Sequence, residues 1–279
     1  MDITVPVVNA FVANGHGGNP AGVVLNAERL TDTQMQAIAT HIGASESAFV
    51  LPSITADYEL RFFTPTVEVS LCGHATIATW SYMFAQGKVQ HGAYSQATLA
   101  GQINIDIDGS GFVFMEQPAQ QMGEEINASE ISNSLDIPND WLNPAFTPQI
   151  VQGALMLSLK SKDLLNAFQL HKPGLLALNG KYGFEALHLF VMTPGTGTLA
   201  SVRNFDPAVG IDEDAATGTT NGSFLTYLQH HNALPEDTIY KIEQGEALGQ
   251  LSFVYGKFQS GHVWIGGTGV PTKTLDITL

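Results

Sequence analysis

Two segments of the chain are apolar on nearly every face of a helix, and each begins just after a small Gly-containing turn. The first, Thr76–Phe84, carries Ile77, Ala78, Trp80, Met83 and Phe84. The second, Ser223–His230, carries Phe224, Leu225, Tyr227 and Leu228. A helix that is apolar all round must be buried. The pattern therefore predicts two buried central helices, one in each half of the chain.

Shorter apolar runs predict strands around these helices. We expect strands at Thr4–Phe11, Ala21–Leu25, Ser47–Leu51, Tyr58–Phe63, Ile150–Leu159 and Ala186–Met192, and a last strand at Thr272–Leu279 that returns to the first half. An amphipathic helix has a capping box at Thr31 and Gln34 and a C-terminal Gly43. Asn127 and Glu130 predict a second capping box, on a helix at Ala128–Leu135.

A sequence pattern occurs twice. Arg61-x-Phe63-x-Pro65 precedes Gly73-His74, and Arg203-x-Phe205-x-Pro207 precedes Gly218-Thr219. Such a long-range repeat predicts two similar halves. We expect an α+β fold of two pseudo-symmetric domains, each a mixed, barrel-like sheet around a central helix. The boundaries would be 1–118, with the returning strand 272–279, and 119–271.

The repeated turns carry chemical meaning because each opens a helix. The first backbone N–H groups of a helix have no partner within it, and the dipole makes this end positive. An anion binds readily there. Two such turns facing each other would hold one carboxylate from both sides.

Composition excludes several partners. The formal net charge is −15 with 11 lysines and arginines, which argues against nucleic acid and against an anionic membrane surface. A single cysteine rules out an intrachain disulfide, no apolar run is long enough for a membrane span, and no basic segment precedes the apolar start. We expect a cytoplasmic protein with a small-molecule partner; whether the protein forms a homodimer is left open. The nine histidines show no ligand spacing, so neither metal nor other cofactor is expected.

Three side chains could act as acids or bases. Glu46 lies between a helix end and an apolar strand, where desolvation favours a general acid/base role, although taken alone this position is more typical of a solvated loop glutamate. His74 could orient Glu46, contact a substrate or be structural. Asp214 could be catalytic or could favour the helix that follows it.

Cys72 and the loop Gly15–Gly18 also have two interpretations each. A helix N-terminus lowers the pKa of a thiol, but a free cysteine is often only a small buried hydrophobe. The glycine loop lacks the spacing of a phosphate-binding motif, so we interpret it as a turn that lets backbone approach a ligand.

Together these segments resemble the phenazine-biosynthesis PhzF-like family, a branch of the diaminopimelate-epimerase-like fold. The resemblance is carried by Asn9-Ala10-Phe11, Gly18-Asn19-Pro20-Ala21-Gly22, Ser45-Glu46-x-x-Phe49, Gly73-His74-Ala75-Thr76 and Glu213-Asp214-x-x-Thr217-Gly218, together with the first Arg-x-Phe-Thr-Pro segment. It covers essentially the whole chain. One departure is Gly249-Gln250-Leu251-Ser252, where family members often carry Gly-Arg-Pro-Ser, so the effect of Gln250 is open.

The resemblance implies a cofactor-independent isomerase with its active site between two domains. Its acid/base glutamate maps onto Glu46, and its polar partners onto His74 and Asp214. The amides that hold a substrate carboxylate map onto Gly73, His74, Gly218 and Thr219, and Asn19 is a ligand contact or turn support. Glu46 would move a proton within a small carboxylate-bearing metabolite.

Two other functions remain open. Racemases of this fold place one cysteine before each turn, but here Cys72 is matched by Thr217, which excludes a two-thiol mechanism. A cysteine/threonine pair resembles hydroxyproline dehydratases, so a lyase with Cys72 as base is the alternative enzyme. A non-catalytic protein that binds small carboxylates is the third hypothesis.

Overall fold

The computed structural model describes residues 2–232, 234–235 and 238–278. The chain forms two compact units, one of Met1–Pro118 with Trp264–Leu279 and the other of Ala119–Val263. Within the described residues, no helix combines the length and the apolar character that crossing a membrane requires. The expected α+β class is confirmed, with one central helix and one mixed sheet in each unit.

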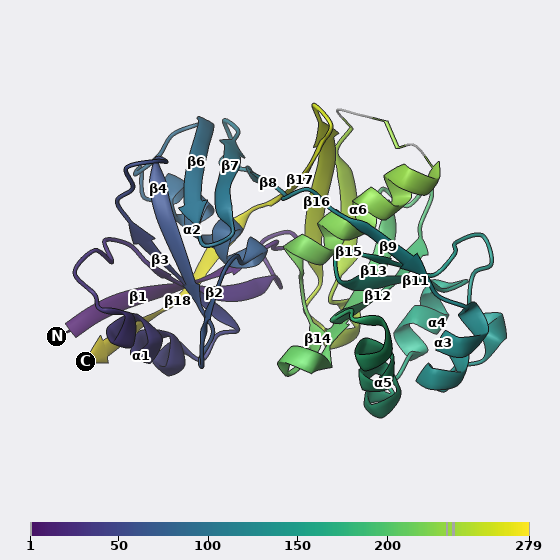
Figure 1. Cartoon of the computed structure of the whole chain (residues 1–279). Coiled ribbons are helices and arrows are strands. Elements are labelled where there is room, and N and C mark those ends of the chain that lie inside the picture. Colours follow the sequence, from purple (N-terminus) through teal and green to yellow (C-terminus); the bar gives the residue numbers. More distant parts are fainter. Residues whose placement is uncertain (1, 233, 236–237, 279) are drawn as a thin grey trace. The chain divides into compact units, whose positions relative to one another are not determined.

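The first unit is built on a mixed sheet. Hydrogen-bonded neighbours run in the order β18 (Gly269–Thr278), β1 (Asp2–Ala10), β2 (Asn19–Val24), β3 (Glu46–Leu51), β4 (Tyr58–Phe63), β6 (Gly92–Thr98), β7 (Gly101–Ile107), β8 (Val113–Glu116) and β17 (His262–Gly267). The pairs β2–β3 and β4–β6 are parallel and the others antiparallel. The C-terminal strand thus lies beside the N-terminal one (Figure 1), and it begins at Gly269 rather than at the expected residue 272.

Helix α2 (Gly73–Ala85) is the central helix of this unit. It packs against β1, β2, β3, β8 and β18. Ile77, Ala78, Trp80 and Met83 are buried, as the pattern predicted. Helix α1 (Asp32–Ile42) covers the sheet elsewhere through Met35, Ile38, Ala39 and Ile42, and its capping box at Thr31 and Gln34 is confirmed.

The second unit repeats the arrangement. Its neighbours run in the order β9 (Met122–Glu125), β10 (Gln149–Val151), β11 (Ala154–Ser158), β12 (Ala186–Met192), β13 (Ala200–Asp206), β15 (Tyr240–Gln244) and β16 (Ser252–Gln259). The pairs β11–β12 and β13–β15 are parallel, the counterparts of β2–β3 and β4–β6. Helix α6 (Gly218–Asn232) contacts β10, β11, β12 and β16 and buries Phe224, Leu225, Tyr227 and Leu228.

Several local predictions were wrong. The expected strand Ile150–Leu159 is a hairpin, because Gln152 and Gly153 both have positive φ and turn the chain. Asn127 does cap α3 (Ala128–Leu135), by accepting from the N–H of Ser129. Glu130, the expected other half of a capping box, instead accepts from Lys181 and Tyr182.

Several elements had not been predicted. Short connecting strands complete both units, β5 (Glu68–Val69) and β14 (Ile211–Asp214). Helices α4 (Lys162–Ala167) and α5 (Lys172–Tyr182) lie near α3 in the second unit (Figure 1). The described residues also form single 3-10 turns at η1 (Asn139–Trp141), η2 (Pro207–Val209) and η3 (Glu246–Leu248).

Candidate active site

Glu46 meets His74 in the first unit. Helix α1 ends at Gly43, whose φ of 66° reverses the chain, and Glu46 opens β3 three residues later, opposite Ala21 of β2. Its Oε2 lies 3.4 Å from Nε2 of His74, and the hydroxyl of Ser45 lies 3.3 Å from the same nitrogen. The Glu46 side chain is 16% exposed, so it is held by a partner and still reached by solvent.

The other ring nitrogen of His74 faces an amide and a thiol. Nδ1 lies 3.5 Å from Nδ2 of Asn19 and 3.4 Å from Sγ of Cys72. Asn19, Cys72 and His74 are all buried residues, with 5 to 7% of their surface exposed. The ring is therefore fixed between a carboxylate and a hydroxyl on one edge and an amide and a thiol on the other.

The glycine loop brings Asn19 to this place. Gly18 has a φ of 82°, and a Cβ there would lie 2.4 Å from the carbonyl oxygen of Ala10. No other residue fits such a close backbone approach. Asn9 donates to the carbonyl of Gly17 across the loop. The loop thus aims Asn19 at His74, a specific role that its spacing alone did not indicate.

The N-terminus of α2 keeps free donors because its cap provides no side-chain acceptor. Cys72 is the N-cap residue and makes no capping hydrogen bond. The carbonyl of Cys72 accepts from the N–H and hydroxyl of Thr76, 3.1 and 2.8 Å away. The N–H groups of Gly73 and His74 lie in the first turn, where a helix offers no acceptor. They remain suited to an anion.

The N-terminus of α6 is held by Gln244 of β15. The amide oxygen of Gln244 accepts from the N–H of Thr217 and from Asn221, at 3.1 and 2.8 Å. Its Nε2 donates to the carbonyl of Asp214 and to the hydroxyl of Thr217, at 2.9 and 3.1 Å. The Thr217 hydroxyl must therefore direct its own proton to Asp214 Oδ2, 2.5 Å away. In this arrangement the Thr217 hydroxyl donates its hydrogen bond to Asp214 and to no other group.

The same framework supports both turns. Thr76 and Asn221 stand three residues after Gly73 and Gly218, and each bonds back to the carbonyl before its glycine. In the first unit Gln96 takes the place of Gln244: it donates to Thr76 and accepts from the indole of Trp80. Each buried glutamine lies on the strand after its central helix. Sequence reasoning missed both, although their matching positions could have revealed them.

The structure also explains why the Arg-x-Phe-x-Pro pattern recurs. Arg61 forms a two-bond fork with Glu68, and Arg203 forms the same fork with Glu213. Each guanidinium lies over the phenylalanine two residues later, with 5.2 and 4.9 Å to the ring centroid. The pattern is thus a structural brace at both sites.

The units differ where chemistry is expected. Asp214 lies opposite Asn204 in the second unit, and Val69 lies opposite Phe62 in the first. Because Asn204 and Phe62 each follow the arginine of the repeated pattern, Asp214 corresponds to Val69. Glu46 comes one residue before Ser47, which lies opposite Phe63, and Ala186 comes one residue before Leu187, which lies opposite Phe205. Because Phe63 and Phe205 are equivalent in the repeated pattern, Glu46 corresponds to Ala186. Gln152-Gly153 is not the counterpart of Glu46, because those residues form the turn between β10 and β11. Each unit supplies a different carboxylate.

A further carboxyl lies close to Asp214. Burial raises the pKa of Asp206 to about 6, and the charges of Glu185 and Asp214 add to this effect. The Asp206 Oδ1 atom is buried and has no hydrogen-bond partner in the structure. Asp206 occupies an unspecified position of the repeated pattern, where Thr64 is its counterpart.

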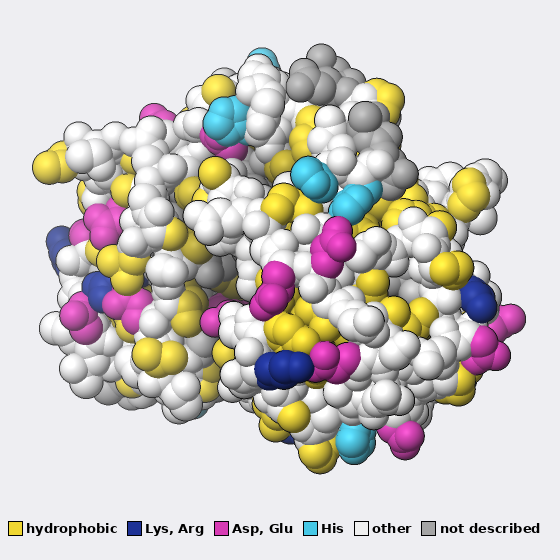
Figure 2. All heavy atoms as spheres, turned by 45° about the vertical axis from the view of Figure 1, so that its right-hand side comes forward, with side chains coloured by type: hydrophobic (Ala, Val, Ile, Leu, Met, Phe, Trp, Pro, Cys, Tyr) yellow, Lys and Arg dark blue, Asp and Glu magenta, His cyan; other side chains and the backbone are white. Residues whose placement is uncertain are grey.

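The remaining positions predicted from the sequence differ in their exposure to solvent. Gly218 is buried, but the side chain of Thr219 is exposed, which fits a backbone role at this turn. Gln250 is also exposed, after η3. Figure 2 shows dark blue Lys and Arg side chains only sparsely on the face drawn.

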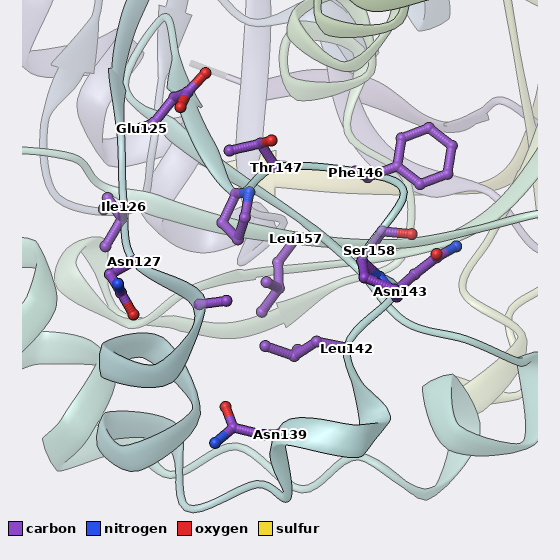
Figure 3. Close-up of a pocket in the computed structure, with 13 residues that line it drawn as sticks. Glu125, Ile126, Asn127, Asn139, Leu142, Asn143, Phe146, Thr147, Leu157 and Ser158 are labelled. Carbon is purple, nitrogen blue, oxygen red and sulfur yellow. The ribbon is translucent and has the colours of Figure 1, made fainter.

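A separate cavity of about 540 Å³ lies in the second unit (Figure 3). Its lining includes Asn127, Asn143, Phe146, Leu157 and Ser158. None of the residues singled out from the sequence for catalysis or binding lines it. The candidate site is therefore defined by clustered side chains and helix ends rather than by this cavity.

Comparison with known proteins supports one family. A family model described as phenazine biosynthesis-like protein matches residues 8–274. The chain is 33% identical over 280 residues to an Escherichia coli (strain K12) protein named uncharacterized isomerase YddE, with 94% of each chain covered. It is 33% identical over 262 residues to an uncharacterized isomerase of Clostridium acetobutylicum, with 88% of this chain and 87% of the other covered.

Solved structures agree on the fold. A Bacillus anthracis phenazine biosynthesis protein of the PhzF family matches with a TM-score of 0.89 and 26% identity over 100% of both chains. A hydroxyproline epimerase from Agrobacterium vitis matches with a TM-score of 0.66 over 99% of this chain and 91% of that one. At 10% identity the second likeness concerns the fold alone.

Proposed function

The chain belongs to the phenazine biosynthesis-like family and is an isomerase of the PhzF-like type, and on that premise we propose a cofactor-independent proton transfer within a small carboxylate-bearing metabolite. The observation that carries the proposal is the contact between Glu46 and His74 at the N-terminus of α2. It joins a solvent-reached base, an orienting group and unpaired backbone donors in one place.

Glu46 takes a proton from carbon and returns it elsewhere on the same molecule. His74 holds the carboxylate through Nε2, and Asn19 and Cys72 hold the ring from the opposite edge. The negative charge that develops on deprotonation is stabilised by the N–H groups of Gly73 and His74. Asp214, held by Thr217, supplies a second carboxylate whose polarity suits a substrate hydroxyl or ammonium group.

The substrate carboxylate is bound by helix N-termini. Gly73 and Gly218 open two helices whose first turns share one hydrogen bond, from the side chain three residues after the glycine to the carbonyl before it, which supports one role for both. An amide analogue of a substrate should then bind much more weakly than the acid, because the dipoles favour the charged form. Gly218→Val should block the site, whereas Thr219→Ala should change little because the donors are backbone groups.

Replacement of the base tests the function. Small amino and aromatic acids are incubated with the enzyme in D₂O, and exchange of carbon-bound hydrogen is followed by NMR. Glu46→Gln should lower the exchange rate by roughly 10²–10⁴-fold, the usual contribution of a general base. Glu28→Gln, on an exposed residue, is the control. Exchange by Glu46→Gln within about tenfold of the wild-type rate would sink the assignment.

One observation favours a second enzyme function. Sγ of Cys72 lies 3.4 Å from Nδ1 of His74, a contact that suits an activated thiol. A lyase with Cys72 as its base would need an acid opposite it, and Thr217 already donates its proton to Asp214. Exchange that depends on Cys72 would support the lyase. Binding without exchange would support a carboxylate-binding protein.

A further inference from the structure

Gln117, in the first unit, is a buried side chain whose amide is unpaired. The residue is 3% exposed, and neither its amide oxygen nor its amide nitrogen has a hydrogen-bond partner among the described residues. In the part of the chain that the structure describes, no other buried side chain leaves two polar atoms unpaired. Such an amide costs stability unless a ligand pairs with it. We propose that Gln117 is a substrate-binding residue whose amide donates to the substrate carboxylate at the N-terminus of α2.

Gln117 directly follows β8 and faces the central helix. Successive residues of a strand point to opposite faces of its sheet. Met115 and Val113, two and four residues earlier, are fully buried, and β8 packs against α2. Glu116 is only partly buried and accepts a hydrogen bond from Asn104. Gln117 thus shares the inner face of the sheet with Met115 and Val113.

The strand register gives the level of Gln117 along the sheet. In the antiparallel pair of β7 and β8, Ile105 lies opposite Met115, so Ile103 is level with Gln117. Ile103 in turn lies opposite Gln96 of β6. Gln117 and Gln96 therefore belong to one row across the inner face, two strands apart.

Gln96 shows where this row crosses α2. It donates to Thr76, in the first turn of the helix, and accepts from the indole of Trp80, in the second. Tyr94, two residues earlier in β6, lies against Trp80. Strand β6 therefore runs toward the N-terminus of α2, and β8 runs in the same direction because both are antiparallel to β7.

The length of β8 leads to the same place. A Cβ on Gly111 would lie 2.6 Å from the ring of Phe84, in the last turn of α2. At about 3.3 Å per strand residue, Gln117 lies roughly 20 Å further along. At about 1.5 Å per helical residue, Gly73 lies roughly 16 Å from Phe84. Gln117 is therefore level with the turn that opens the helix.

The amide suits the carboxylate that the proposed function binds there. A carboxylate has about four acceptor positions, so the N–H groups of Gly73 and His74 leave room for those of Gln117. Gln96, the same residue type in the same row, has partners on the helix for both of its amide atoms. The inference rests on the proposed function in one respect, that this helix end binds the substrate carboxylate.

Two variants test whether the amide is structural. Methionine keeps the length and the stem of glutamine but offers no donor. Gln117→Met should leave the urea midpoint of the first unit, followed by hydrogen exchange, unchanged or higher, because no hydrogen bond is lost. Gln96→Met should lower it, because the bonds to Trp80 and Thr76 are lost. An equal fall in both variants would reveal a structural role and overturn the inference.

Binding is followed by NMR on the isotope-labelled protein, with acetate, alanine and benzoate as probes. The side-chain amide signals of Gln117 are identified by their absence in Gln117→Met. At least one acid should shift them together with the backbone amides of Gly73 and His74. Gln117→Met should weaken the binding of that acid by about 10- to 100-fold, the contribution of a hydrogen bond to a charged group. Glu28→Gln, on an exposed residue, should bind it as the wild type does.

The outcomes separate this inference from the proposed function. Shifts at Gly73 and His74 without Gln117, or unchanged affinity in Gln117→Met, would overturn the role of Gln117 and leave the carboxylate site standing. If none of the three acids shifts any of these signals, the carboxylate site fails and the inference with it. Proton exchange that does not depend on Glu46 would remove the proposed base and leave the role of Gln117 unaffected.

Discussion

Replacing Arg203 with methionine should destabilise the second unit far more than Arg61→Met destabilises the first. Both arginines belong to the repeated pattern and both pair with a glutamate by two hydrogen bonds. Their surroundings differ. The side chains of Arg203 and Glu213 are 9% and 12% exposed, against 18% and 23% for Arg61 and Glu68. Arg203 also donates to the carbonyls of Leu165 and Phe168.

These contacts set the magnitude. Methionine keeps the length and apolar stem of the side chain, so the loss is mostly electrostatic. Removing one partner of a buried ion pair costs about 3–5 kcal/mol, because the other charge stays buried. The orphaned carbonyls of Leu165 and Phe168 add to this cost. Arg61 instead has the exposed Asp32 as its second partner, so we expect about 1–2 kcal/mol for Arg61→Met.

The assay must resolve the two units, since one transition cannot be assumed for them. Amide hydrogen exchange followed by mass spectrometry measures the stability of each unit separately. Peptides from α4 and β13 report on the second unit, and peptides from β4 report on the first. The pair Arg203→Met with Glu213→Leu should recover at least half of the loss, because it removes the unpaired charge. Equal losses for Arg203→Met and Arg61→Met would refute the reasoning, as would no recovery in the double variant.

Three further predictions follow. Cys72→Ala should lower hydrogen exchange of a native substrate by less than about tenfold, because Thr217 gives Cys72 no acid partner; a loss as large as that of Glu46→Gln would favour the lyase. Burial lowers the pKa of His188 from 6.5 to about 4, so the unfolded chain binds an extra proton between these values. His188 should therefore lower the unfolding free energy as pH falls through that window, and urea titrations should show a smaller acid loss in His188→Gln. The pKa of Asp206 is raised from 3.8 to about 6, so this carboxyl has the opposite effect: its native form loses stability as pH rises through that range. Asp206→Asn should then stabilise the protein at pH 7 by about 1–3 kcal/mol, and no gain by urea unfolding would contradict the burial argument.

Predictions from local sequence rules succeeded for elements that depend only on residues near one another in the chain. The capping box at Thr31 and Gln34 and the turn at Gly43 depend on neighbours a few residues apart, so the bounds of α1 could be predicted. The two central helices were found because burial on every side leaves an apolar signal that no other element produces. The family followed from motifs spread over the whole chain, and the comparison confirmed it.

Tertiary structure decided what depends on partners distant in sequence. Glu130 forms part of no capping box because Lys181 and Tyr182 reach it from α5. The counterpart of Glu46 is Ala186, which only strand register could identify. The structural role of Gln96 and Gln244 could not be predicted from the sequence either, because it depends on their burial and on hydrogen-bond partners distant in the chain.

The sequence by itself determined the repeated design: two apolar helices, each opened by a glycine turn and preceded by an arginine brace. It did so because apolar periodicity and turn chemistry are local properties of a chain. The fold alone decided which side chains meet, since Asn19, Glu46, Cys72 and His74 come from three segments and become neighbours only when β2 and β3 pair beside α2. The same meeting joins a base, an orienting imidazole and a thiol, and so creates the proposed chemistry.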